Sequence, residues 1–282
     1  MSKTSGKHPR RARIGALPGF GLTFGYSMFY LSALVILPLS TIVFRPFDLG
    51  WDKFWKVVAN PRVIASYGVS FSTAVTAASI CLVVGTIIAW TLVRYRFPGR
   101  RLLEALVDLP FALPTAVAGI SFATLWAPNG WLGSFAAKAG ITVINTWSGI
   151  VIALVFIGFP FVVRAVQPVL AELNGEIEEA AQSLGATRAQ TTVRVIIPNL
   201  IPSMLTGFIL AFARCLGEYG SVVFIAGNLP MKTEIAPILI MSKLYQFDYN
   251  GASAIALSML IMSLLTLVIL NALQLWQARR SV

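Results

Sequence analysis

Six stretches of this chain are apolar over lengths that suit a membrane. A helix crosses the hydrocarbon core in about twenty residues, and a backbone exposed to lipid must satisfy its own hydrogen bonds, so each stretch is predicted to be a helix. Only 12% of the 282 residues are charged, about half the share in a soluble domain. The sequence therefore predicts an all-α membrane protein of about six spans. Their predicted limits are residues 22–44, 69–93, 105–127, 147–169, 200–226 and 252–276.

The formal net charge of +11 lies in short basic clusters beside the apolar runs. Such clusters contact anionic lipid headgroups and mark the cytoplasmic loops, and no basic stripe on a soluble module indicates nucleic-acid binding. Residues 1–20 are predicted to be a basic cytoplasmic tail, and residues 21–282 a membrane domain with both termini in the cytoplasm. The basic residues on the predicted cytoplasmic side are Lys3, Lys7, Arg10, Arg11, Arg13, Arg94, Arg96, Arg100, Arg101, Arg164, Arg188, Arg194, Arg279 and Arg280.

Residues that hold metals, cofactors or reactive groups are scarce. Cys81 and Cys215 lie far apart in separate apolar runs, where thiols usually act as small hydrophobic groups. His8 has no clustered partner, and no GxxxxGK[ST] loop is present to hold ATP phosphates. We therefore expect no metal, no cofactor and no catalytic activity in this chain.

The connector between the fourth and fifth spans, at about residues 170–199, is long and patterned. Its apolar residues recur at helical spacing, with breaks expected at Asn174-Gly175 and at Gly185. Thr187 is a predicted N-cap for a following helix that ends before Pro198. The segment is predicted to form two short helices that dock another protein. The alternative is an amphipathic helix on the headgroups, although anionic lipids would repel its glutamates.

Glu179-Ala180-Ala181, Gly185, Val195, Ile197 and Pro198 resemble the EAA loop of ABC importer permeases. Longer stretches at 93–100, 108–119, 161–168, 216–220 and 224–228 are similar to the T-type permeases of sulfate/thiosulfate importers. The resemblance implies a type I ABC importer permease in a bacterial inner membrane, with a cytoplasmic coupling helix between spans four and five. The residues that it places in ATPase coupling are Glu178, Glu179, Ala180, Ala181, Gly185 and Pro198.

The same resemblance implies partners and a cargo. A second, W-type permease would pair with this chain on two copies of an ATPase, and a periplasmic binding protein would deliver sulfate or thiosulfate. Three alternatives stay open: a molybdate or tungstate permease, a secondary anion transporter, and a membrane enzyme with several spans.

Two features within the spans are candidates for the anion's route. Pro110 and Pro114 should bend or open the third span, and Thr115 adds a hydroxyl beside them. Two interpretations of such a break stay open: it lines the translocation cavity, or it is a kink required only for helix packing. Arg214 lies four residues before Glu218 in the predicted fifth span, where ionisable groups face protein or water rather than lipid. Two interpretations of this pair stay open. Arg214 supplies positive potential near the anion's route, or the two residues form an internal ion pair that fixes the helix or its contact with a partner.

Overall fold

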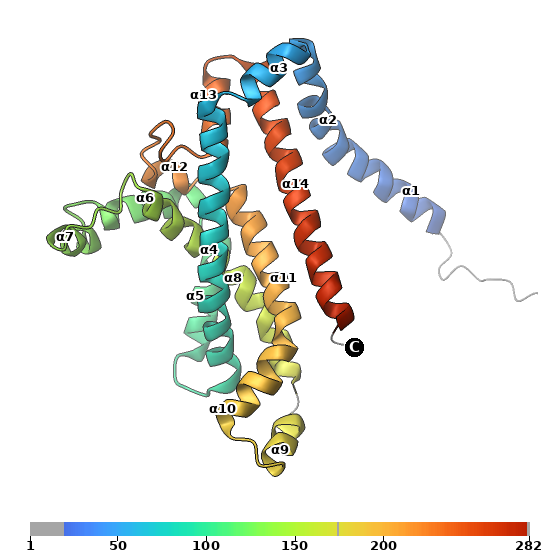
Figure 1. Cartoon of the computed structure of the whole chain (residues 1–282), viewed down its shortest axis with the longest axis vertical. Helices are drawn as coiled ribbons and strands as arrows, with labels where there is room; N and C mark the ends of the chain where they lie inside the picture. The colour runs from blue at the N-terminus through green and yellow to red at the C-terminus, as the bar shows by residue number, and fades with distance from the viewer. Residues whose placement is uncertain (1–19, 174, 281–282) are drawn as a thin grey trace, which may run out of the picture.

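The computed structural model describes residues 20–173 and 175–280, which form helices joined by short loops (Figure 1). Nearly all of the predicted basic tail therefore lies outside the described residues, as does Asn174. In chain order the helices are α1 (Phe20–Leu31), α2 (Leu37–Phe44), α3 (Trp51–Val58), α4 (Pro61–Arg94), α5 (Arg100–Ala112), α6 (Thr115–Trp126), α7 (Trp131–Lys138), α8 (Trp147–Glu172), α9 (Gly175–Ser183), α10 (Arg188–Thr191), α11 (Ile197–Leu216), α12 (Val222–Ile225), α13 (Ala236–Tyr245) and α14 (Tyr249–Arg280).

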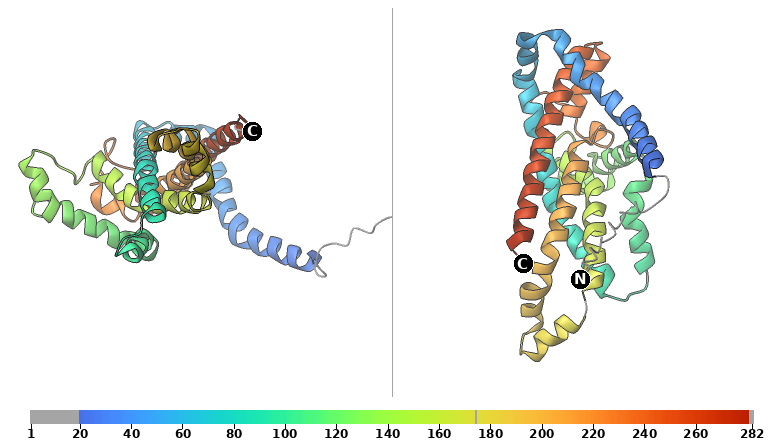
Figure 2. Two further views of the ribbon diagram at one scale, coloured as in Figure 1. Left: turned by 90° about the horizontal axis from the view of Figure 1, so that it is seen from below. Right: turned by 90° about the vertical axis from the view of Figure 1, so that its right-hand side faces the viewer.

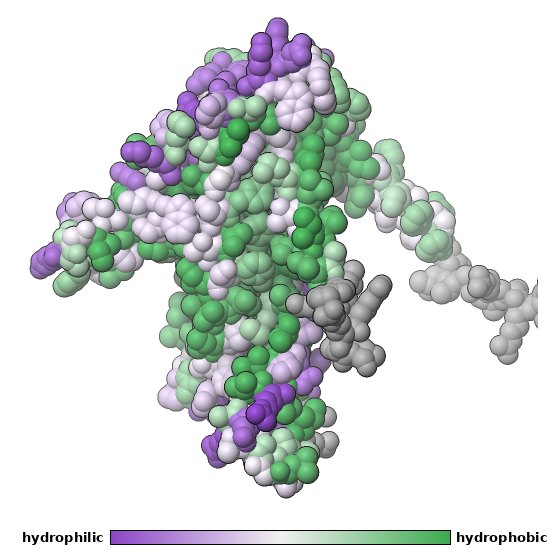
Figure 3. All heavy atoms as spheres, viewed as in Figure 1, coloured by the Kyte–Doolittle hydropathy of each residue, from purple (hydrophilic) through white to green (hydrophobic). Residues whose placement is uncertain are grey.

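The prediction of about six spans is confirmed. Within the described residues, five helical stretches are long and apolar enough to cross a membrane: Phe20–Leu49, Pro61–Arg94, Trp147–Glu172, Arg188–Leu216 and Tyr249–Gln274. Counted as one broken span, the pair α5 and α6, whose axes are bent by 109°, gives the sixth. Apolar side chains dominate the middle of the molecule, and hydrophilic ones gather towards its ends (Figure 3).

Helix α4 begins eight residues before the predicted start of the second span. Its first turns carry polar residues, which an apolar-run criterion leaves out of the span, and these residues bind the start of α13 and the loop before it. Arg62 donates to both carboxylate oxygens of Glu234, at 2.8 and 2.7 Å. The hydroxyl of Ser70 accepts the backbone N–H of Ala236, at the start of α13, at 2.8 Å. Tertiary contacts therefore extend this helix beyond its apolar part.

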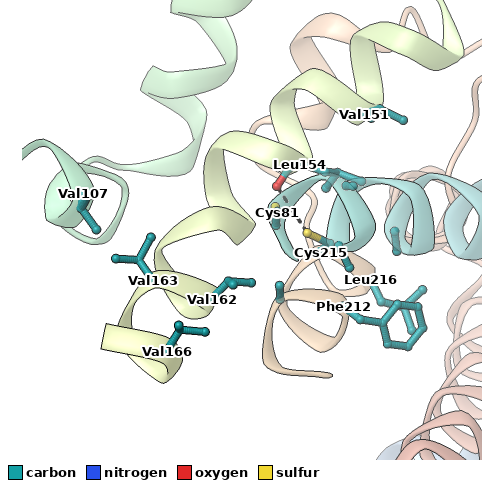
Figure 4. Packing of buried hydrophobic residues seen from close by; sticks show 14 of the residues in the cluster. Cys81, Val107, Val151, Leu154, Val162, Val163, Val166, Phe212, Cys215 and Leu216 are labelled. Carbon is teal, nitrogen blue, oxygen red and sulfur yellow. Dashed lines mark hydrogen bonds between the residues drawn. The ribbon is translucent and has the colours of Figure 1, made fainter. Parts of the chain in front are cut away.

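The core lies where α4, α8 and α11 pack together (Figure 4). Small residues on α4 allow close approach, and Ala74, Ala77 and Ala89 are fully buried. Cys81 and Cys215 are buried free thiols that donate to the carbonyls of Val155 and Leu154, at 3.4 and 3.3 Å. These three helices form the scaffold from which the remaining elements project.

Gly85→Ala should destabilise this scaffold by about 1–3 kcal/mol. A Cβ on Gly85 would lie 2.7 Å from the Cβ of Val162, which is itself fully buried on α8. Gly68→Ala is the matched control on the same helix, because a Cβ there meets no atom within 4 Å. Thermal unfolding of the purified assembly measures both variants. Equal midpoints for the two would show that the α4–α8 contact tolerates an added methyl group.

Helices project from the scaffold in three directions. Seen from below, α1 extends away on one side of the bundle and α6 and α7 extend on another (Figure 2). The side chains of α1 and α2 are not buried in this chain. Helix α9 lies at the lower tip in Figure 1, below the ends of α4, α5 and α8. We call this tip the α9 end of the molecule.

Candidate functional site

Two backbone breaks separate α9 from the helices around it. Leu173 leaves the helical conformation after α8, with a ψ of 107°. Gly185 follows α9 with a φ of +85°, in the left-handed region that glycine adopts at little cost. Thr187 then caps α10, as predicted: its hydroxyl accepts the N–H of Gln190 at 3.3 Å, and Gln190 accepts the N–H of Thr187 at 2.8 Å. The sequence thus builds a short helix between two hinges.

The prediction that the next helix ends before Pro198 is wrong. A π-helical turn at Thr192–Ile196 joins α10 to α11, and the helical stretch runs on from Arg188 to Leu216. Pro198 lies two residues after this turn, inside the continuous helix, and a π-helical turn is one of the local adjustments that accommodate proline's missing N–H. The connector after Gly185 is therefore continuous with the fifth span.

The predicted coupling residues divide between two faces of α9. Glu179, Ala180 and Gly185 are exposed, and Ala181 is partly exposed. Glu178 instead contacts Arg94 at the end of α4. Sequence reasoning counted Leu184 only as part of an apolar stripe, but its side chain is 90% exposed beside Gly185. The outward face of α9 and this leucine together offer a surface for a partner.

The third span breaks at Leu113-Pro114. Leu113 is extended (ψ 131°), as expected for a residue before proline, and Pro114 precedes the first residue of α6. The expectation that the prolines bend or open this span is confirmed by the 109° bend between α5 and α6. Pro110 lies inside α5 rather than at the break. Thr115 therefore starts a new helix that leaves the bundle sideways (Figure 1).

The turn after α11 packs against the start of α6. A Cβ on Gly220 would lie 2.2 Å from the hydroxyl oxygen of Thr115, and one on Gly119 would lie 2.5 Å from the carbonyl oxygen of Ser221. Only glycine allows the two segments to approach this closely. The structure thus brings Thr115, at the broken span, beside the turn that holds Glu218.

Glu218 lies beyond α11, because the helix ends at Leu216 and not near residue 226 as predicted. Gly217 leaves the helix, and the carboxylate of Glu218 accepts the N–H and the hydroxyl of Ser221 at 2.9 and 3.2 Å. Its other oxygen lies 2.6 Å from a guanidinium nitrogen of Arg214. Glu218 is 2% exposed and Arg214 35% exposed. The predicted pair exists, and it holds a tight turn.

A second ion pair was missed by sequence reasoning. Arg164 was expected in a cytoplasmic loop, but it lies within α8, more than two turns before its end. Its Nε donates to Asp108 on α5 at 2.9 Å, a second nitrogen contacts the other carboxylate oxygen, and a third donates to Gln167 at 3.2 Å. A cavity of about 540 Å³ adjoins Arg164 and Gln167. The sequence did carry a signal for this pair, because Asp108 and Arg164 both lie within predicted spans, where ionisable groups are rare.

Both charged side chains of this second pair remain about half exposed, at 41% for Arg164 and 48% for Asp108. Ionisable groups at membrane depth face water or protein rather than lipid. The exposed face shared by α5 and α8 is therefore suited to an aqueous cavity or to a partner subunit.

Comparison with known proteins agrees with this architecture. Residues 81–282 match the family described as binding-protein-dependent transport system inner membrane component. The sulfate transport system permease proteins CysT of Salmonella typhimurium and Escherichia coli are 50% and 49% identical over 266 residues, with 94% of this chain and 96% of each relative covered.

Two solved structures share the fold. A chain of a bacterial alginate ABC transporter, in complex with an alginate pentasaccharide-bound periplasmic protein, matches with a TM-score of 0.75 at 14% identity, covering 90% of this chain and 93% of that one. A chain of the MetNI methionine ABC transporter, in inward-facing conformations, matches with a TM-score of 0.54 at 18% identity, covering 78% and 96%.

Proposed function

Because the chain belongs to the family of binding-protein-dependent transport system inner membrane components, we propose that it is the sulfate-conducting permease subunit of an ATP-driven importer. Sulfate is proposed as the cargo because relatives about 50% identical over nearly the whole chain are sulfate transport permeases. The chain is a transport subunit and not an enzyme. The structural observation that carries the proposal is α9, a hinged helix with an exposed outer face at the tip of the molecule.

An importer of this family works with an ATPase and a substrate-binding protein. We place two copies of the ATPase under the pair of permease subunits, with one copy on the α9 end of this chain, where Glu179, Ala180 and Gly185 face outward. The basic connector at residues 94–101 belongs to the same end, so the positive-inside rule supports a cytoplasmic location for it. A periplasmic sulfate-binding protein then meets the opposite end, near α3 and α13, and both chain termini are cytoplasmic.

A second, W-type permease subunit completes the proposed assembly. The broken span and the Asp108–Arg164 face are half exposed in this chain, and a partner facing them encloses a route between the two subunits. Sulfate keeps its charge at neutral pH, so such a route needs hydrogen-bond donors or positive potential. The proposed lining or support of this route still consists of Pro110, Pro114, Thr115, Arg214 and Glu218. The structure leads us to add Arg164 to this proposal.

Reconstitution tests this function directly. Vesicles that contain this chain with the second permease, the ATPase and the binding protein should accumulate sulfate only with ATP. Vesicles with this chain alone should accumulate none. Uptake or lipid turnover by the chain alone would contradict a subunit role. Transport of molybdate at the rate of sulfate would contradict the assigned cargo.

A further inference from the structure

An ion pair joins α9 to the end of α4. A guanidinium nitrogen of Arg94, the last residue of α4, contacts the carboxylate of Glu178, and each side chain is 25% exposed. The nitrogens Nε and Nη2 of Arg94 and the oxygen Oε1 of Glu178 are themselves buried, and none of these three atoms forms a hydrogen bond within the described residues, so the contact is an ion pair only. The guanidinium also lies over the ring of Trp90, 5.6 Å from its centre. Because water is excluded from these atoms, the attraction is screened less than in a surface pair.

This ion pair is a third attachment for α9. The other two are the backbone breaks at Leu173 and Gly185, where the chain turns sharply. A helix held only at two hinges can rotate about the line that joins them, and a third contact off that line prevents the rotation. Apart from the backbone bonds within the helix itself, the hydrogen bonds that the described part of α9 and its following turn make lie within residues 179–186.

The attachment point on α4 belongs to the scaffold. Ala89 and Leu92, in the last turns of α4, are fully buried, and Leu170 near the end of α8 is 1% exposed. All three residues belong to one buried apolar cluster shared by α4, α8 and α11. A force on Glu178 therefore enters a rigid, close-packed body rather than a mobile loop.

We propose that Arg94 and Glu178 form the link that converts movement of α9 into movement of the membrane helices. Arg94 acts as a positioning residue: it prevents α9 from rotating on its hinges when the ATPase pulls on it. Glu178 is thus engaged by α4 of the same chain, whereas Glu179 remains free to contact the ATPase. This inference rests on the proposed function, because it concerns the coupling of ATP hydrolysis to sulfate uptake.

The test measures sulfate imported per ATP hydrolysed by the complete reconstituted importer. Arg94→Ala and Glu178→Gln should each lower this ratio about fivefold or more, while the ATPase still co-purifies in normal amount. The exchanged pair Arg94→Glu with Glu178→Arg should restore the ratio to within about twofold of the original protein. Rescue by exchange would show that the pair, and not either side chain alone, carries the effect, and normal co-purification of the ATPase separates a loss of coupling from a loss of assembly. Glu104→Gln, which removes the partly exposed pair with Arg100 within α5, is the control and should leave the ratio unchanged.

Three results would overturn the link: unchanged ratios in both single variants, an exchanged pair as defective as the single variants, or loss of the ATPase from both single variants. Should Arg94→Ala fail to assemble, Glu178→Gln decides alone, because its amide keeps the size of the carboxylate on a cytoplasmic helix. A measurement on the unsubstituted protein distinguishes failure of the proposed function from failure of the proposed link. If it shows no ATP-driven uptake, the proposed function itself fails. If it is coupled and the variants are equally coupled, only the link fails.

Discussion

Gly185→Trp should release the ATPase from the membrane assembly, with about a tenfold or greater loss of co-purified ATPase. Gly185 is exposed beside the outward face of α9, and a Cβ there meets no atom of this chain within 4 Å. A Cβ at this position therefore does not clash with its own subunit, and the indole that it carries would occupy the space in which a partner docks. Quantifying the ATPase that co-purifies with the tagged permease measures the effect.

Gly185→Ala is the matched control for the backbone. Its φ of +85° costs any residue with a Cβ about 1–2 kcal/mol, and alanine carries the same cost as tryptophan without the bulk. The difference between the two variants therefore reports contact with the partner and not strain at the hinge. If alanine removes as much ATPase as tryptophan does, hinge geometry and not docking explains the loss.

Charge reversal at Glu179 tests the same surface without altering the backbone. Glu179→Lys should also release the ATPase, since Glu179 lies on the outward face of α9. Glu172→Lys supplies an equal change of charge at an exposed position at the end of α8, outside α9. Equal retention of ATPase by both variants would remove Glu179 from the docking surface.

Arg214→Ala should abolish sulfate uptake, the second large effect. Its removal leaves the carboxylate of Glu218 buried, with Ser221 as its remaining partner. An unpaired buried charge is expensive, and because Arg214 is one-third exposed we expect a cost of up to about 3 kcal/mol. Uptake in vesicles and thermal unfolding of the assembly measure the two consequences separately.

The double variant Arg214→Gln with Glu218→Gln decides between a lock and a transport role. It carries no buried charge, so we expect the stability lost in Arg214→Ala to return, while uptake stays lost because the positive potential is absent. Glu104→Gln removes another ion pair, in which Arg100 lies 3.2 Å away within α5, and this variant should keep its uptake. Recovery of uptake in the Arg214 and Glu218 double variant would make the pair a structural lock only.

The features that sequence alone determined are those with a local cause. Runs of apolar residues located the spans, because crossing hydrocarbon depends on the hydropathy of about twenty consecutive residues. Pro114 located the break in the third span, because its ring restricts the residue before it. Gly185 and Thr187 located the hinge and the cap beyond α9, since both act on the backbone within a few residues.

Only the tertiary structure decided which charged groups from distant parts of the chain meet. Glu178 and Glu179 are adjacent in sequence, yet one contacts Arg94, 84 residues away, and the other faces outward. Asp108 and Arg164 form a pair only because α5 packs beside α8. The continuation of the helix through Pro198 likewise depends on a π-helical turn that no residue pattern indicated. Ion pairs between distant segments depend on how those segments pack, and no local property of the chain encodes that packing.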